Sequence, residues 1–335
     1  MVVFIHLPCI SADSLTQAKF ERLNTDTLEV WHLEEDQFRP GYILFSETSA
    51  LKQLNTNTWQ LSTLVGETTS HSYTEGEGTS ARFNVISGFV QVNSTYWILV
   101  DQGNHCIRGV LKSSPRSRLG VLYNTSHLAG TCGQSGNDAT KFNTPSKIIK
   151  APKKDRFYIS DYGNIAIREF NLVSGDLTIW HTFFVGFGPV GIALRETGIL
   201  YMITSKIVTV HKIINENSAR SSIGRVTAAE EFGYLDGSLL TAKFYFPQEI
   251  AFLNDSLLLV ADKGNNRLGL VDTKQAIVST ICDGSRSGND SSSCTMPGAQ
   301  ALAVTANGAF YVGTKQGIWK ITPFKSGEQL KRVTS

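Results

Sequence analysis

Three stretches of the sequence repeat one pattern: VDQGNHCIRGV at 100–110, ISDYGNIAIREF at 159–170 and VADKGNNRLGLVD at 260–272. Each has apolar strand formers, then Asp-x-Gly-Asn, then a second apolar run that contains an arginine. Apolar runs of this length, separated by Gly and Asn, predict two antiparallel strands joined by a tight turn. Three copies therefore indicate a repeated β unit.

The residues around each copy extend the hairpin to four strands, with turns rich in Asn, Gly, Ser and Pro. Weaker copies occupy 41–66, 191–213 and 301–322, and no long segment has the period of an amphipathic helix. One position marks the end of the second strand in every unit: Glu47, Asp101, Asp161, Thr204, Asp262 and Thr314. Four strands repeated every ~40 to 60 residues are typical of a β-propeller. We expect an all-β, six-bladed β-propeller of four-stranded antiparallel blades.

The pattern also suggests domain limits. Residues 1–26 do not fit it, so we expect an N-terminal segment there and the propeller at 27–335. The stretch 27–35 reads as the first strand of the opening blade, and EQLKRVTS at 328–335 as the fourth strand of the last blade. Pairing of the two ends would remove the free edges of the ring.

Composition excludes some classes of function. The 335 residues are 41% apolar and 18% charged, with a formal net charge of +2, which argues against DNA as a partner. No run reaches the ~18 to 20 apolar residues that span a bilayer. The opening MVVFIHLPCI has no Lys or Arg before it and is a poor secretory signal as written.

The repeated tetrapeptide has a structural interpretation. Gly is expected in the turn because positive φ costs it little, Asn because it tolerates that backbone and bonds to it, and Asp because its carboxylate can accept turn N–H groups. The residues are Asp101, Gly103, Asn104, Asp161, Gly163, Asn164, Asp262, Gly264 and Asn265. The alternative is that one of the aspartates is catalytic or binds a metal.

The segments between blades repeat as well. GYLDG at 233–237 with AKFYFP at 242–247, KFNTP at 141–145 and ARFN at 81–84 share a Gly-rich loop, a basic residue and a Phe. We expect Phe83, Phe142 and Phe244 to pack between blades. Together with the Asp-x-Gly-Asn hairpins, these segments resemble the NHL-repeat family of β-propellers over roughly residues 38–325. The resemblance implies a fold that serves many functions.

The cysteines suggest disulfide bonds. In an antiparallel blade the start of the third strand lies beside the end of the fourth, which favours a bridge from Cys106 to Cys132. The fifth blade has Arg267 where Cys106 stands, so Cys282 is expected to pair with Cys294 across a short loop, leaving Cys9 unpaired or paired outside this chain. Five unrelated thiols are the alternative, and the spacing does not suit zinc.

Disulfides favour an oxidising compartment, and four N-x-[S/T] sequons agree: Asn93, Asn124, Asn254 and Asn289, all in expected turns or loops. An extracellular or secreted protein is therefore favoured, with a cytoplasmic one as the alternative.

No common catalytic motif is present, and the seven histidines are scattered. We expect no catalytic residues, no metal site and no cofactor, although Glu47, Asp101, Asp161 and Asp262 could converge at the channel to hold Ca²⁺.

Three functions remain open. The first is a non-catalytic scaffold that binds a protein or glycan. The second, from the likeness to intracellular NHL propellers, is binding of single-stranded RNA, with Arg108, Arg168 and Arg267 along one rim or as exposed salt-bridge partners. The third, from the likeness to propeller enzymes of the lyase, lactonase and strictosidine synthase type, needs a metal at the channel. We favour the first.

Overall fold

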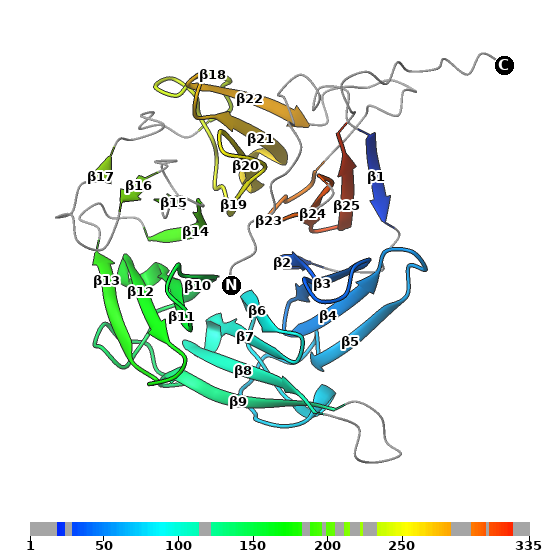
Figure 1. Cartoon of the computed structure of the whole chain (residues 1–335), viewed down its shortest axis with the longest axis vertical. Helices are drawn as coiled ribbons and strands as arrows, with labels where there is room; N and C mark the ends of the chain where they lie inside the picture. Colours follow the sequence, from blue (N-terminus) through cyan, green and yellow to red (C-terminus); the bar gives the residue numbers. More distant parts are fainter. Residues whose placement is uncertain are drawn as a thin grey trace.

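The computed structural model describes residues 19–23, 29–113, 122–182, 188–195, 199–204, 211–214, 222–223, 233–282, 296–305 and 308–323. These residues form six antiparallel sheets arranged around a common centre (Figure 1). The predicted six-bladed β-propeller is therefore confirmed.

The first three blades are built from consecutive strands. Blade 1 contains β2 (Val30–Glu35), β3 (Tyr42–Glu47), β4 (Ala50–Asn55) and β5 (Leu61–Gly66). Blade 2 contains β6 (Ile86–Asn93), β7 (Tyr96–Asp101), β8 (Cys106–Lys112) and β9 (Tyr123–Gly130). Blade 3 contains β10 (Pro145–Lys150), β11 (Arg156–Asp161), β12 (Ala166–Asn171) and β13 (Leu177–Thr182).

The other three blades follow in the same sense. Blade 4 contains β14 (Pro189–Leu194), β15 (Ile199–Thr204), β16 (His211–Ile214) and β17 (Ser222–Ile223). Blade 5 contains β19 (Glu249–Phe252), β20 (Leu257–Asp262), β21 (Arg267–Asp272) and β22 (Ile277–Cys282), with the short β18 (Gly237–Ser238) on its outer edge. Blade 6 contains β23 (Ala301–Val304), β24 (Phe310–Thr314), β25 (Gly317–Thr322) and β1 (Lys19–Leu23).

Blade 6 differs from the prediction. Its outer strand is β1, which pairs antiparallel with β25 from Lys19 opposite Thr322 to Leu23 opposite Ile318. Residues 19–23 therefore belong to the propeller, and the expected boundary after residue 26 is wrong. The stretch KFERL does not predict a strand, because it has a single β-branched or aromatic residue. The expected strand at 328–335 lies outside the described residues.

The core lies between neighbouring blades. Phe83 and Phe142 are fully buried and Phe244 nearly so. Each of these side chains lies on a connector, the segment that joins one blade to the next. Each packs in an apolar cluster drawn from two blades, as Phe83 does between Leu44 of blade 1 and Phe89 of blade 2. The predicted packing is confirmed. Among the described residues, no helix has the length and apolar character that crossing a bilayer requires.

Candidate functional site

The Asp-x-Gly-Asn hairpins form one turn of 3-10 helix, at Gln102–Asn104 (η2), Tyr162–Asn164 (η3) and Lys263–Asn265 (η4). The left-handed backbone falls on the residue after the Asn: φ is 56° at His105, 53° at Ile165 and 52° at Asn266. Neither the Gly nor the Asn of the motif has positive φ. The expectation that Gly serves the turn in this way was wrong.

Glycine is required instead because the preceding connector crosses the hairpin at close range. A Cβ on Gly103 would lie 2.4 Å from Cγ of Asn84, and one on Gly163 would lie 2.4 Å from Cγ of Asn143. The backbone itself is as close in blade 5, where a Cβ on Gly264 would lie 2.3 Å from the Tyr245 carbonyl oxygen.

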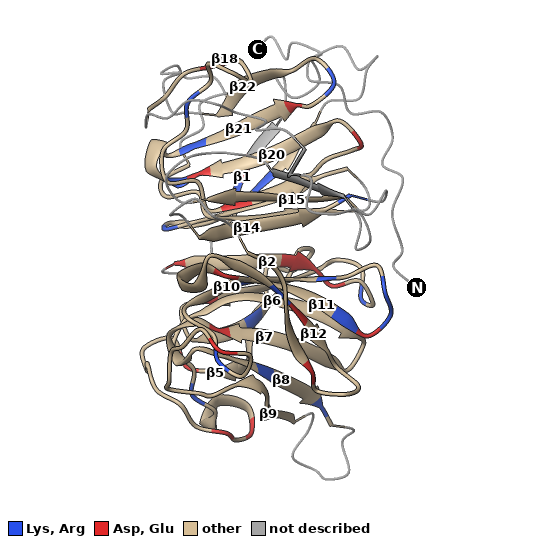
Figure 2. Ribbon diagram, turned by 90° about the vertical axis from the view of Figure 1, so that its left-hand side faces the viewer, with Lys and Arg blue, Asp and Glu red and all other residues tan. Residues whose placement is uncertain are grey.

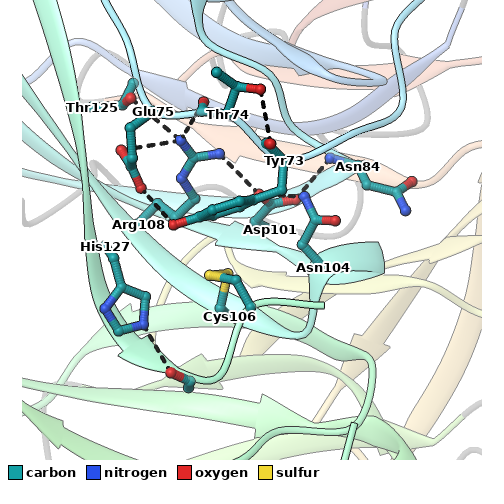
Figure 3. The surroundings of a disulfide bond; sticks show 12 residues. Tyr73, Thr74, Glu75, Asn84, Asp101, Asn104, Cys106, Arg108, Thr125 and His127 are labelled. Carbon is teal, nitrogen blue, oxygen red and sulfur yellow. Dashed lines mark hydrogen bonds and ion pairs between the residues drawn. A yellow bond between two sulfur atoms is a disulfide. The ribbon is translucent and has the colours of Figure 1, made fainter. Parts of the chain in front are cut away.

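The aspartate binds that connector to its own blade (Figure 3). In blade 2, Oδ1 of Asp101 accepts the backbone N–H of Asn84 at 2.8 Å. Its Oδ2 accepts the side-chain amide of Asn104 at 2.9 Å and Nη1 of Arg108 at 3.2 Å. We call this set the Asp–Asn–Arg network. The N–H donor comes from the connector, whereas the sequence suggested the hairpin turn.

Blades 3 and 5 repeat the Asp–Asn–Arg network. Oδ2 of Asp161 accepts Asn164 at 2.8 Å and Nε of Arg168 at 2.9 Å. Oδ2 of Asp262 accepts Asn265 at 2.7 Å and Nε of Arg267 at 2.6 Å. Arg267 stands two residues earlier on its strand than the other arginines, yet its guanidinium reaches the same carboxylate position.

Burial decides what these charges can do. The side chains of Arg108, Arg168 and Arg267 are at most 1% exposed, which corrects the suggestion that they line a rim or the blade surface. In the side view, basic and acidic residues are interspersed along the ribbon (Figure 2). The residues proposed for RNA contact are therefore internal.

The carboxylates are also held within their blades. Burial raises the pKa of Asp101, Asp161 and Asp262 above its ordinary value, and the network's hydrogen bonds and its arginine only partly offset this effect. Glu47 pairs with Lys52 of its own blade. In the described part of the chain, no three His, Cys, Asp or Glu side chains are grouped as metal ligands. The four carboxylates suggested for Ca²⁺ do not converge.

The disulfide between Cys106 and Cys132 is present, as predicted (Figure 3). Cys106 pairs with Gly130 in the ladder of β8 and β9, so the start of the third strand does lie beside the end of the fourth. Cys282 ends β22 and is disulfide-bonded. Its expected partner Cys294, like Cys9, lies outside the described residues.

The sequons lie in different settings. Asn93 is exposed at the end of β6, and Asn254 is half-buried in a bend. Asn124 lies within β9, so the expectation that all four fall in turns or loops was wrong. Asn289 lies outside the described residues.

A second ionisable cluster lies where the inner strands meet. Nζ of Lys147 on β10 is 3.2 Å from Oε2 of Glu249 on β19 and 3.2 Å from Nδ1 of His32 on β2. His32 Nδ1 is 3.1 Å from Glu249 Oε1. All three residues are more than nine-tenths buried. We call them the central triad.

Strand register explains why these residues meet. In every blade, the inner-strand residue that faces the position just before the Asp-motif residue belongs to one ring: His32, Gly88, Lys147, Gly191, Glu249 and Ala301. Blades 1, 3 and 5 contribute long ionisable side chains, and blades 2, 4 and 6 contribute Gly or Ala. The small members give room: a Cβ on Gly191 would lie 3.0 Å from Cα of Glu249.

The three groups shift the pKa of one another. Burial raises the pKa of Glu249, but Lys147, His32 and the N–H of Leu302 together bring it below its ordinary value. Burial lowers the pKa of Lys147, an effect that Glu249 only partly offsets. Burial and Lys147 lower the pKa of His32, but Glu249 and Glu34 together leave it raised.

Sequence reasoning missed the central triad. In the sequence His32 is one of seven scattered histidines, and no pattern distinguishes Lys147 or Glu249. Each of the three residues comes from a different blade, so no local sequence motif contains them. The one available signal was the ring position itself, which follows from the hairpin once the register of the inner strand is known.

The comparisons with known proteins establish the architecture. No protein-family model matches the sequence, and no curated protein matches it significantly. The fold is similar to that of an auxiliary nutrient binding protein from Bacteroides thetaiotaomicron VPI-5482, at 12% identity and a TM-score of 0.66, over 90% of this chain and 71% of that chain.

Two enzyme structures are also similar. Streptogramin B lyase has 12% identity and a TM-score of 0.56, over 92% of this chain and 98% of that chain. Virginiamycin B lyase from Staphylococcus aureus has 12% identity and a TM-score of 0.52, over 92% of this chain and 99% of that chain. At this identity the likenesses show a shared β-propeller fold, and the fold alone.

Proposed function

We propose that this chain is a non-catalytic NHL-type β-propeller that acts as an extracellular scaffold for a protein or glycan partner. The observation that carries the proposal is the mutual pairing of the charged groups inside the ring. A general acid or base must reach its substrate within hydrogen-bond distance. Here the central triad joins blades 1, 3 and 5 to one another, and the Asp–Asn–Arg networks join connectors to blades.

The loops offer the surface for recognition. Several large side chains on the hairpins and connectors are more than a third exposed: Tyr73, Tyr162, Tyr234, Leu235, Leu240, Tyr245 and Phe246. Exposed aromatic and apolar side chains on loops held by a rigid scaffold favour binding of a partner. Tyrosine combines an apolar ring with a polar hydroxyl, which is why it is enriched at interfaces.

An extracellular location is supported by two features. The Cys106–Cys132 disulfide persists in an oxidising environment. Asn93 of an N-S-T sequon is exposed and open to a glycan. The nutrient binding propellers of similar fold also favour a binding role.

The test uses protein secreted from eukaryotic cells. Intact mass before and after reduction and deglycosylation should show reducible disulfides and glycan, and the same preparation should bind on a glycan array or to a cell-surface protein panel. Lys154→Met, at a side chain that is 89% exposed, should leave that binding unchanged, whereas Tyr234→Ala or Tyr245→Ala should weaken it. Free thiols, no glycan and no bound partner would overturn the proposal.

A propeller enzyme is the second candidate, and one observation favours it. In the described part of the chain, Nε2 of His32 is buried with no hydrogen-bond partner, and it lies 3.8 Å from Oε1 of Glu34. A histidine beside a carboxylate is a suitable general base. Turnover of a streptogramin B or a lactone by the wild-type chain, lost in His32→Gln, would establish this function in place of the scaffold.

A further inference from the structure

The connectors that precede blades 2, 3 and 5 differ at one place. Carbonyls of Thr74 and Arg82 accept hydrogen bonds from Arg108, and those of Asp138 and Lys141 accept from Arg168. These pairs are therefore equivalent, and Leu235 and Lys243 form the matching bridge before blade 5. Between them lie residues 75–81 and 236–242 in two connectors, but only residues 139–140 in the third.

The longer loops cover the outer edge of their blades. In blade 2 the carbonyl of Gly76 accepts the N–H of Thr125 on β9 at 3.0 Å, and Glu77 bridges Asn124. In blade 5 the loop forms β18, where Gly237 pairs with Val278 of β22. Each edge strand thus receives an added extended segment.

The same loops supply a carboxylate to the buried arginine. Oε2 of Glu75 lies 3.2 Å from Nη2 of Arg108, and Oδ1 of Asp236 lies 2.9 Å from Nη1 of Arg267 (Figure 3 for blade 2). Asp236 also accepts the N–H of Thr280 on the edge strand β22 at 2.8 Å. Strand pairing and ion pairing therefore come from one segment.

Within the described ranges, blade 3 has neither partner. Among the described residues, no segment pairs with the outer edge of β13, and Nη1 of Arg168 is buried with no hydrogen-bond acceptor. By register Ile179 takes the place of Thr280, and its side chain is 50% exposed beside Arg168. A buried guanidinium N–H without an acceptor is costly, and an open edge strand can accept another strand.

We propose that an extended segment of a partner protein adds to β13 and places an Asp or Glu carboxylate on Arg168. Main-chain hydrogen bonds along the edge supply affinity, and the charge-assisted bond to the guanidinium selects an acidic residue. The segment takes the place that residues 75–81 and 236–242 take in the other two blades. This assignment deepens the scaffold function proposed above and rests on it.

The probe is a labelled peptide with the chain's own sequence from residues 72–83, SYTEGEGTSARF, which already fits blade 2. We expect binding to the intact protein in fluorescence anisotropy, with hydrogen-exchange protection of the Leu177 and Ile179 amides. A peptide with Glu75→Gln should bind at least tenfold more weakly, because it cannot supply a charged acceptor.

Two protein variants test the location. Replacing residues 139–140 by the sequence of residues 75–81 fills the edge in cis and should weaken peptide binding at least tenfold. The second variant, Ile179→Pro, keeps the test decisive if the grafted chain fails to fold. It removes an N–H that faces away from the sheet, at an edge strand where proline is tolerated, and should weaken peptide binding to the same extent. Thermal melting confirms that each variant is folded.

The proposal is overturned if both variants bind the peptide like the wild type, if the peptide does not bind, or if protection falls outside β13. It is also overturned if the chain forms a dimer that Ile179→Pro abolishes, because a second copy then occupies the edge. Glycan or cell-surface binding retained by Ile179→Pro would leave the scaffold function intact on another surface. If folded wild-type protein bound neither the peptide nor a glycan or cell-surface partner, the scaffold function would be rejected as well.

Discussion

The Asp–Asn–Arg networks and the central triad are both buried and charged, yet they are built in opposite ways. A network such as Asp101, Asn104 and Arg108 comes from one hairpin and recurs in three blades. The central triad takes one residue from each of three blades and occurs once. Repetition therefore preserves contacts within a blade, while the ring position is free to differ between blades.

The largest test of this difference is Lys147→Met. It removes the ammonium group that pairs with Glu249, at a site that joins blades 1, 3 and 5. Loss of one partner of a buried ion pair costs about 3–5 kcal/mol. Denaturant unfolding should show a fall of that size in the free energy of unfolding. Lys154→Met is the control, because that side chain is 89% exposed; equal stability of the two variants would show that the triad does not join the blades.

Reduction of the Cys106–Cys132 bond tests the cross-link nearest a network. The bond closes a loop with a sequence separation of 26, for which chain entropy gives about 3.5 kcal/mol. Cys106→Ala with Cys132→Ala should lower the melting temperature, whereas the central pairing stays intact. Unchanged melting would mean that the network alone holds the connector.

Gly163→Ala tests whether the motif glycine serves the crossing of the connector. Its Cβ would overlap the side chain of Asn143, and overpacking of this kind costs about 1–3 kcal/mol. Asn143→Ala should recover much of the loss in the double variant, since the two substitutions are coupled. Additive losses in a double-mutant cycle would assign the glycine to backbone conformation instead.

The smallest expected effect is the pH dependence of the central triad. The folded state raises the pKa of His32 above its ordinary value of 6.5, because Glu249 and Glu34 outweigh burial and Lys147. A raised pKa means that the folded chain binds the proton more tightly, so this contribution is complete below pH 6.5 and is lost as pH rises through the folded value. Unfolding curves from pH 5.5 to 8.5 should therefore show a fall that His32→Gln lacks; a parallel fall in the variant would contradict it.

The fold could be predicted from the sequence because blade hairpins repeat local turn chemistry. Asp101, Asp161 and Asp262 mark the strand ends, and Cys106 could be paired with Cys132 once the strand order was known. Local patterns do not encode tertiary approach, however. The role of Gly103 depends on Asn84, which arrives from the connector.

The arginines and the central triad show the same limit. Arg108 reads as an outward residue of a strand, and only the connector that covers it makes it buried. His32, Lys147 and Glu249 are distant in sequence and meet because their inner strands share one register. The third connector's shortness was visible in the sequence, but its meaning required the loops of blades 2 and 5 for comparison.

The strand β1 has a consequence for the order in which this protein is made. Its partner β25 ends at Thr322, so the ring cannot close until the ribosome has synthesised that strand. Blades 1 to 5 can fold as they emerge, since domains generally fold from the N-terminal end during synthesis. Blade 6 stays incomplete until then, because β1 has no partner in the sheet before β25 is made. Closure of the ring is then the last step of folding and the one that joins the most distant segments. It is slow because bringing distant segments together costs loop-closure entropy.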